Sequence, residues 1–194
     1  MKKIFIIILY SQLNLFAMHN FYTNFNTQDI EIRTDFDIAQ YTDKIKLEKF
    51  YLGGRILYFT DKYSSDEPEL YSEINFHFNY KSKEYKNLNI ALGAKLNHSS
   101  IKDKTITSIP LSMSVKYNIK DFLYPFTVEI NGAISPSILT FEDGLNFYEY
   151  GANISFPIIE DIDFNCGVRN INTNYIDNNV ILNKSFYIGT KIKF

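Results

Sequence analysis

The chain of 194 residues contains no tryptophan, one cysteine and three histidines. Because Cys166 stands alone, an intrachain disulfide and a cysteine-based metal cluster are both excluded. Basic and acidic residues nearly balance at 20 and 22, so the basic excess of a nucleic-acid-binding protein is missing. After residue 17 no apolar run is long enough to cross a bilayer as a helix. A membrane location would therefore require strands.

Residues 1–17 have the features of a secretory signal peptide. The pair Lys2 and Lys3 precedes an apolar stretch, and Ala17 is a small residue suited to a cleavage site. A buried helix or an uncleaved anchor is the alternative, but the undiluted apolar run is too short to span a bilayer. We expect cleavage after residue 17, leaving 18–194 as one domain.

From residue 29 onward, apolar and polar residues alternate with period two, the pattern of strands with two different faces. One face carries aliphatic and aromatic residues, drawn from 17 Phe and 15 Tyr. The other carries charged residues, Asn, Ser and Gly, and no amphipathic helix interrupts the series. The predicted strands are 29–38, 47–59, 70–80, 87–98, 107–118, 125–134, 146–156, 162–172 and 184–194.

The predicted connections alternate between long and short. Transmembrane barrels have long external loops and short periplasmic turns in this order, whereas a soluble sandwich has no reason to follow it. The long connections are 60–69, 99–106, 135–145 and 173–183, and the short ones are 81–86, 119–124 and 157–161. The sequence therefore predicts an all-β, up-and-down antiparallel transmembrane β-barrel.

The last residues support closure of this barrel. The ending resembles the C-terminal assembly signal of outer-membrane proteins, with Gly189, Ile192 and Phe194 at the matching positions. The last strand must pair with the first, because no strand edge can be left in lipid. We favour ten strands, with a weak first strand around Phe21. Eight strands, with 18–46 as a separate N-terminal segment, are the alternative.

Short motifs between about 85 and 194 resemble the YfaZ family of small outer-membrane proteins. They are Leu92–Gly93–Ala94–Lys95, Ser135–Pro136–Ser137, Phe147–Tyr148–Glu149–Tyr150–Gly151–Ala152, Cys166–Gly167–Val168–Arg169–Asn170–Ile171 and Tyr187–Ile188–Gly189. The resemblance implies an outer-membrane β-barrel and brings no established activity. The family is richer in Gly and Ala than this chain.

Charged residues on the polar face are the main candidate site. They are Arg55, Glu73, Lys95, Lys116, Glu129, Glu149 and Arg169. Inside a narrow barrel an unpaired charge is costly, so these residues should form ion pairs. We expect a side-chain-filled polar interior, and a narrow polar conduit is the alternative.

A catalytic reading has one candidate. His98 and Ser100 have the spacing of outer-membrane lipid hydrolases that remove acyl chains. The next predicted strand offers Ser108 to Leu111 and no carboxylate to orient the imidazole. We therefore predict that the chain is not an enzyme and that it needs no cofactor or metal.

These observations predict a Gram-negative outer-membrane barrel of structural or general role. A narrow porin-like pore for small solutes is the first alternative, and a lipid-modifying enzyme or a soluble β-protein follows. The expected partners are outer-membrane lipid, lipopolysaccharide and, through the last strand, the barrel-assembly machinery. The ligand and the oligomeric state stay open.

Overall fold

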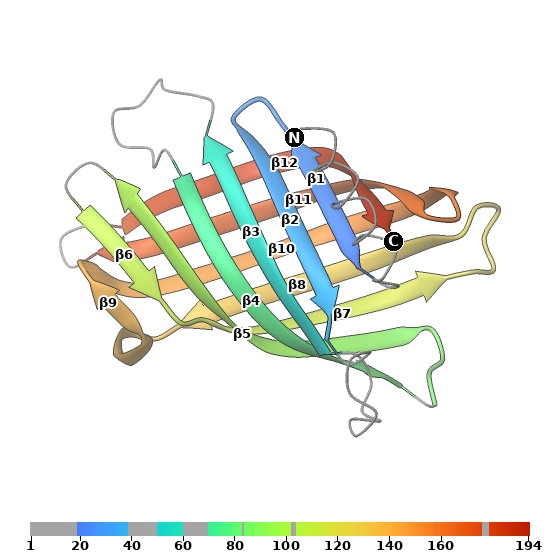
Figure 1. Ribbon diagram of the computed structural model, residues 1–194, viewed down its shortest axis with the longest axis horizontal. Coiled ribbons are helices and arrows are strands. Elements are labelled where there is room, and N and C mark those ends of the chain that lie inside the picture. Colours follow the sequence, from blue (N-terminus) through green and yellow to red (C-terminus); the bar gives the residue numbers. More distant parts are fainter. Residues whose placement is uncertain (1–18, 39–49, 60–69, 83, 102–103, 176–178) are drawn as a thin grey trace, which may run out of the picture.

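The computed structural model describes residues 19–38, 50–59, 70–82, 84–101, 104–175 and 179–194, and these form a closed antiparallel β-barrel of ten strands (Figure 1). The strands of the wall are β1 (Asn20–Phe25), β2 (Asp29–Asp37), β3 (Phe50–Phe59), β4 (Leu70–Lys81), β5 (Leu88–Ile101), β7 (Leu111–Ile119), β8 (Phe126–Ser135), β10 (Gly144–Ile159), β11 (Ile162–Tyr175) and β12 (Asn179–Lys193). The expected signal peptide, 1–17, lies outside the described residues.

The strands pair with their chain neighbours around the barrel, and β12 pairs with β1 to close it. Six residue pairs form this seam, from Asn20 opposite Lys193 to Phe25 opposite Ile188. His19 and Phe194 extend the seam through two backbone hydrogen bonds of 2.6 and 3.0 Å. The predicted ten strands and the predicted pairing of the last strand with an N-terminal strand are both confirmed.

The period-two pattern sorts the side chains of each strand onto two faces. In β2, Asp29, Glu31 and Asp35 are buried inside the barrel, whereas Ile32 and Phe36 on the outer face are each 46% exposed. The same division runs around the wall, with half-exposed aliphatic residues near the middle of the strands: Ile56, Ile74, Leu92, Ile130, Val168 and Ile188. The barrel therefore has a polar lining and an apolar outer surface.

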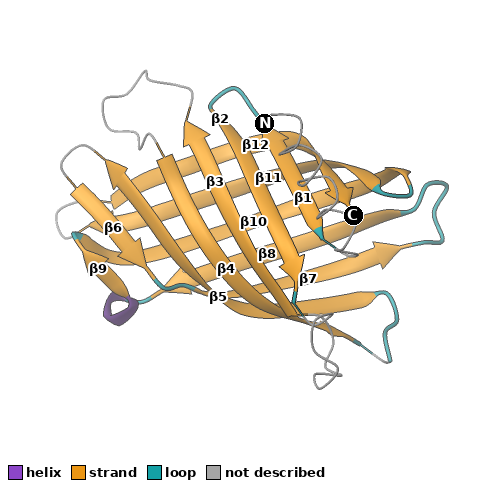
Figure 2. Ribbon diagram, viewed as in Figure 1, coloured by secondary structure: helices purple, strands orange, loops and turns teal. Residues whose placement is uncertain are grey.

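One end of the barrel carries extra strands, and we call it the flap rim. There β6 (Lys104–Ser108) pairs with the extended end of β5, and β9 (Thr140–Glu142) pairs with β6. We call β6 and β9 the flap, which lies at the left of Figure 1. The only helical turn among the described residues is the 3₁₀ helix η2 (Ser137–Leu139), which precedes β9 (Figure 2). Within the same residues, no helix could cross a membrane.

Three predicted boundaries on the flap side of the barrel are corrected by the structure. In the expected loop 99–106, residues 99–101 belong to β5 and 104–106 to β6, and the expected strand 107–118 is divided between Ser108 and Leu111, at Pro110. Proline cannot donate to a ladder, so the pairing of β6 ends there and β7 begins one residue later. The expected loop 173–183 is also mostly strand, because β11 continues to Tyr175 and β12 begins at Asn179.

The opposite end of the barrel carries Phe194, and we call it the terminus rim. The β4–β5, β7–β8 and β10–β11 hairpins turn here and reach the right of Figure 1. The short connections expected at 81–86, 119–124 and 157–161 coincide with these turns. The prediction of short connections at this end is therefore correct.

Candidate functional site

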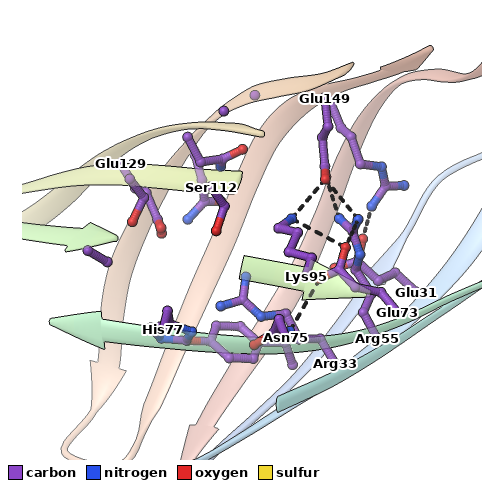
Figure 3. Close-up of a pocket in the computed structure, with 18 of the residues that line it drawn as sticks. Glu31, Arg33, Arg55, Glu73, Asn75, His77, Lys95, Ser112, Glu129 and Glu149 are labelled. Carbon is purple, nitrogen blue, oxygen red and sulfur yellow. Dashed lines mark hydrogen bonds and ion pairs between the residues drawn. The ribbon is translucent and has the colours of Figure 1, made fainter. Parts of the chain in front are cut away.

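The predicted charged residues all line one cavity inside the barrel. Figure 3 shows five of them, Arg55, Glu73, Lys95, Glu129 and Glu149. Arg55, Glu73 and Lys95 come from the neighbouring strands β3, β4 and β5. The remaining four come from the strands that follow around the wall: Lys116 on β7, Glu129 on β8, Glu149 on β10 and Arg169 on β11. They form three separate groups.

The largest group joins β3, β4 and β5 to β10 across the lumen. Arg55 holds Glu149 through two bonds of 2.5 and 3.0 Å, and it lies 2.6 Å from Glu73. The Lys95 ammonium donates to Glu149 at 2.8 Å and to Glu73 at 3.2 Å. Two cations thus alternate with two carboxylates, and both carboxylates are nearly fully buried. We call these four residues the central network.

A tyrosine completes the hydrogen bonding of the central network. The Tyr71 hydroxyl donates to Glu73 at 3.0 Å and accepts from Arg55 at 3.1 Å. It also accepts from Asn97 at 3.2 Å, and Asn97 in turn accepts from Ser108 at 2.5 Å. A buried ion pair is favourable only when its remaining donors and acceptors are satisfied. Tyr71 and Asn97 meet much of this requirement.

The second group lies at Arg169. Its guanidinium donates to Asp29 at 2.7 Å, forms an ion pair with Glu31 and donates to Asn183 at 3.0 Å. Asn183 donates to Asp29 at 2.7 Å, so the group links β11 and β12 to β2. Asp29 and Glu31 were not named as site residues, although both stand on the polar positions of their strand. Arg169 lies 140 positions from Asp29 in the sequence, so no local pattern reveals that the two residues pair.

The third group lies nearer the terminus rim. Lys116 pairs with Glu129 at 3.3 Å across β7 and β8, and Arg33 pairs with Asp35 at 2.7 Å along β2. These pairs are more accessible than the central network, with 26% of the Lys116 side chain exposed. A cavity of about 110 Å³ is lined by residues of all three groups. This volume holds a few water molecules.

Glycines on the inner face make room for these large side chains. A Cβ added at Gly167 would lie 2.6 Å from the Tyr187 hydroxyl, because the tyrosine crosses over this glycine toward Asn153. A Cβ at Gly53 would lie 2.5 Å from Asp35 and 2.6 Å from Asn75. Narrow barrels are filled by their own side chains, and these two glycines leave room for the side chains of Tyr187, Asp35 and Asn75.

On the flap side of the central network, a cluster of buried apolar side chains lies in the lumen beside buried polar residues such as Ser99 and Thr173. The apolar members are Leu57, Phe59, Tyr71, Ile106, Phe147, Ile171, Tyr175 and Leu182, and we call them the plug. On β3 and β11 the plug residues follow Arg55 and Arg169 by two positions, so they stack directly above the charges. Leu57 and Ile171 are fully buried. The expectation of a polar interior is therefore incomplete, because apolar side chains join the polar ones on this side of the lumen.

His98, the catalytic candidate that the sequence argues against, lies on the outer face beside the flap. His98 Nδ1 is 2.9 Å from the Thr107 hydroxyl, which lies 3.3 Å from Glu142. Strand β9 thus supplies a carboxylate that the sequence reading did not foresee. Glu142 reaches the threonine rather than the imidazole, whereas a hydrolase requires its acid on the base. The geometry gives no support to a catalytic pair of His98 and Ser100.

The other histidines and the last residues lie toward the terminus rim. His77 points into the lumen and stacks on Tyr51, with ring centroids 5.1 Å apart. His19 packs against Phe36 and Phe194, and burial lowers its pKa below 6.5 while the Asp37 charge partly opposes the shift. Within the part of the chain that the structure describes, no three His, Cys, Asp or Glu side chains are placed to hold a metal.

The residues of the expected assembly signal lie on β12 and just beyond it. Gly189 faces inward between β11 and β1, and an added Cβ there would collide with Thr23 and Asn24 of β1. Ile192 lies outward opposite Phe21, and Phe194 ends the seam beside His19. The glycine therefore has a packing role at the seam, and recognition by an assembly machinery stays a prediction.

No protein-family model matches the chain, and no curated protein matches it. The resemblance to the YfaZ family therefore rests on the short motifs quoted above.

Proposed function

We propose that the chain is a small outer-membrane β-barrel with a closed lumen, which acts through its outer surface and rims rather than as a channel. The distribution of side chains carries this proposal. Apolar residues half-exposed on the outside surround ion pairs that are buried on the inside. A soluble protein shows the reverse arrangement, and monomeric soluble proteins rarely expose apolar patches beyond a few hundred Å².

The height of the apolar surface agrees with a bilayer. Outward residues of β10 run from Tyr148 to Ile158, a distance of ten residue-to-residue steps. At about 3.3 Å per residue and a tilt of about 40°, this length spans about 25 Å of membrane. Tyrosines stand near both ends of the outer face, at Tyr58 and Tyr148 toward the flap rim and at Tyr80 and Tyr117 toward the terminus rim. Such residues are typical of membrane interfaces.

The terminus rim would then face the periplasm and the flap rim would face outward. In this orientation the flap is available to lipopolysaccharide, and the residues Gly189, Ile192 and Phe194 are available to the barrel-assembly machinery. The location is tested by fractionation and by heat-modifiable migration on a gel. A chain recovered in the periplasmic fraction, with no shift on heating, would refute it.

The closed lumen is tested by conductance in planar bilayers. The wild-type barrel should give no steady current, because the plug and the central network fill its cross-section. A variant with Arg55→Ala, Phe147→Ala and Glu149→Ala removes side chains from both layers and should conduct. A steady ohmic current from the wild type would instead favour the second candidate, a narrow pore, which the 110 Å³ polar cavity supports.

A further inference from the structure

The tip of the β7–β8 hairpin exposes three large apolar side chains in succession. Phe122, Leu123 and Tyr124 are 66%, 85% and 72% exposed, and Leu123 is the most exposed large hydrophobic residue among those described. Most of the surface of each side chain is therefore left uncovered by the barrel. Consecutive exposed apolar residues usually mark a contact surface.

Aromatic contacts connect this tip to the outer face of the barrel. Phe122 packs edge-on against Phe126, with ring centroids 5.8 Å apart. Phe126 in turn lies 5.8 Å from Phe156 on β10. The next outward residue of β10, Ile158, is 62% exposed. The tip is therefore continuous with the apolar outer surface.

The position of the tip suits a membrane interface. The β8–β10 register pairs Thr127 with Ser155, and its extension by three residues places Tyr124 level with Ile158 at the end of the apolar face. Charged Lys120 and Asp121 precede the apolar residues. Figure 1 shows this hairpin reaching beyond the C-terminus at the terminus rim. Tyrosine suits such a position because its ring is apolar and its hydroxyl is polar.

We propose that Phe122, Leu123 and Tyr124 form an interfacial anchor that inserts among the phospholipids of the leaflet at the terminus rim. The proposal rests on the membrane location proposed above. Phospholipid is favoured over a protein partner because the tip continues the face assigned to lipid, and because its neighbouring charges, one of each sign, offer no net charge for a charged partner. The anchor would fix the depth of this side of the barrel in the bilayer.

The absence of tryptophan makes a direct test possible, since a single introduced tryptophan is then the only source of tryptophan fluorescence. Three single variants of the full chain are folded into phosphatidylcholine vesicles: Leu123→Trp at the tip, Ile130→Trp at the middle of the outer face, and Ser100→Trp at the end of the β5–β6 hairpin. Quenching by phospholipids brominated at different depths of the acyl chain is measured for each.

The anchor predicts that Leu123→Trp emits at shorter wavelength than Ser100→Trp and is quenched at least twofold more, most strongly by bromines near the headgroup. Ile130→Trp should be quenched most strongly by deep bromines. Quenching of Ile130→Trp without quenching of Leu123→Trp would refute the anchor, leaving the tip to solvent or to a protein partner. Absence of quenching at Ile130→Trp would refute the membrane location itself.

Discussion

The substitution Glu149→Gln tests whether the central network stabilises the barrel as its geometry implies. Glu149 accepts three charge-assisted bonds, two from Arg55 and one from Lys95. After the substitution, two buried cations share the single carboxylate of Glu73. Removal of one member of a buried ion pair costs about 3–5 kcal/mol, because the other member stays buried without its counter-charge.

We expect the lower end of this range, about 3 kcal/mol. Glutamine keeps one acceptor oxygen, and Glu73 still contacts both cations at 2.6 and 3.2 Å. A loss of this size changes the folding equilibrium by about a hundredfold. Because the chain has no tryptophan, reversible urea unfolding in detergent or vesicles is best followed by far-UV circular dichroism. The matched control is Glu160→Gln in the exposed β10–β11 turn, which should change stability by less than about 0.5 kcal/mol.

A double-mutant cycle with Lys95 identifies the cause of this loss of stability. Lys95→Met removes one cation, so the double variant Lys95→Met with Glu149→Gln leaves Arg55 paired with Glu73 alone. The double variant should be more stable than the sum of the two single effects predicts, since the excess charge is gone. If the effects simply add, or if Glu149→Gln behaves like the exposed control, the network does not hold the lumen by charge pairing.

Three further experiments test the outer face, the inner glycines and the packing of His19. Ile74→Arg places a charge on the outer face and should lower the free energy of unfolding in vesicles by about 2–4 kcal/mol. Ser100→Arg beside the flap should be tolerated. Equal effects of the two variants would argue against lipid contact. Gly167→Val should destabilise the barrel by displacing a tyrosine ring of β12. In Gly132→Ala the added Cβ would lie 3.7 Å from its nearest neighbour, so this variant should cost at most about 1 kcal/mol. The two effects are compared by their urea unfolding midpoints. The pKa of the buried His19 ring should lie below 6.5 when it is measured by NMR. Because the folded pKa is lowered, the packing of His19 in the barrel should be stable above that pH and should weaken as the pH falls. A titration midpoint above 6.5 would contradict the burial argument.

The sequence was sufficient to predict whether a strand residue faces the lumen or the outside, because the alternation of polar and apolar residues is a local property. Glu73 and Glu149 stand on polar positions flanked by apolar ones, so their inward direction follows without knowledge of any partner. Strand number followed from the need for closure and from the position of the turns. The same reasoning required a first strand around Phe21, where β1 lies.

The plug could have been found from a break in the alternation. Ile56, Leu57, Tyr58 and Phe59 are apolar on both parities, which shows that the inner face also becomes apolar near this strand end. The flap was harder to foresee, because apolar residues continue at every second position from Ile109 to Tyr117. Only Pro110 indicated a division there.

What the sequence determined by itself was the two-faced barrel wall, since a residue's parity fixes which side of the sheet it occupies. What only the tertiary structure decided was which charges meet. Arg55 and Glu149 are 94 positions apart and reach each other because strand tilt and the register of every ladder between β3 and β10 place them at one height. Registers are cooperative properties of the closed sheet, so no single strand carries that information.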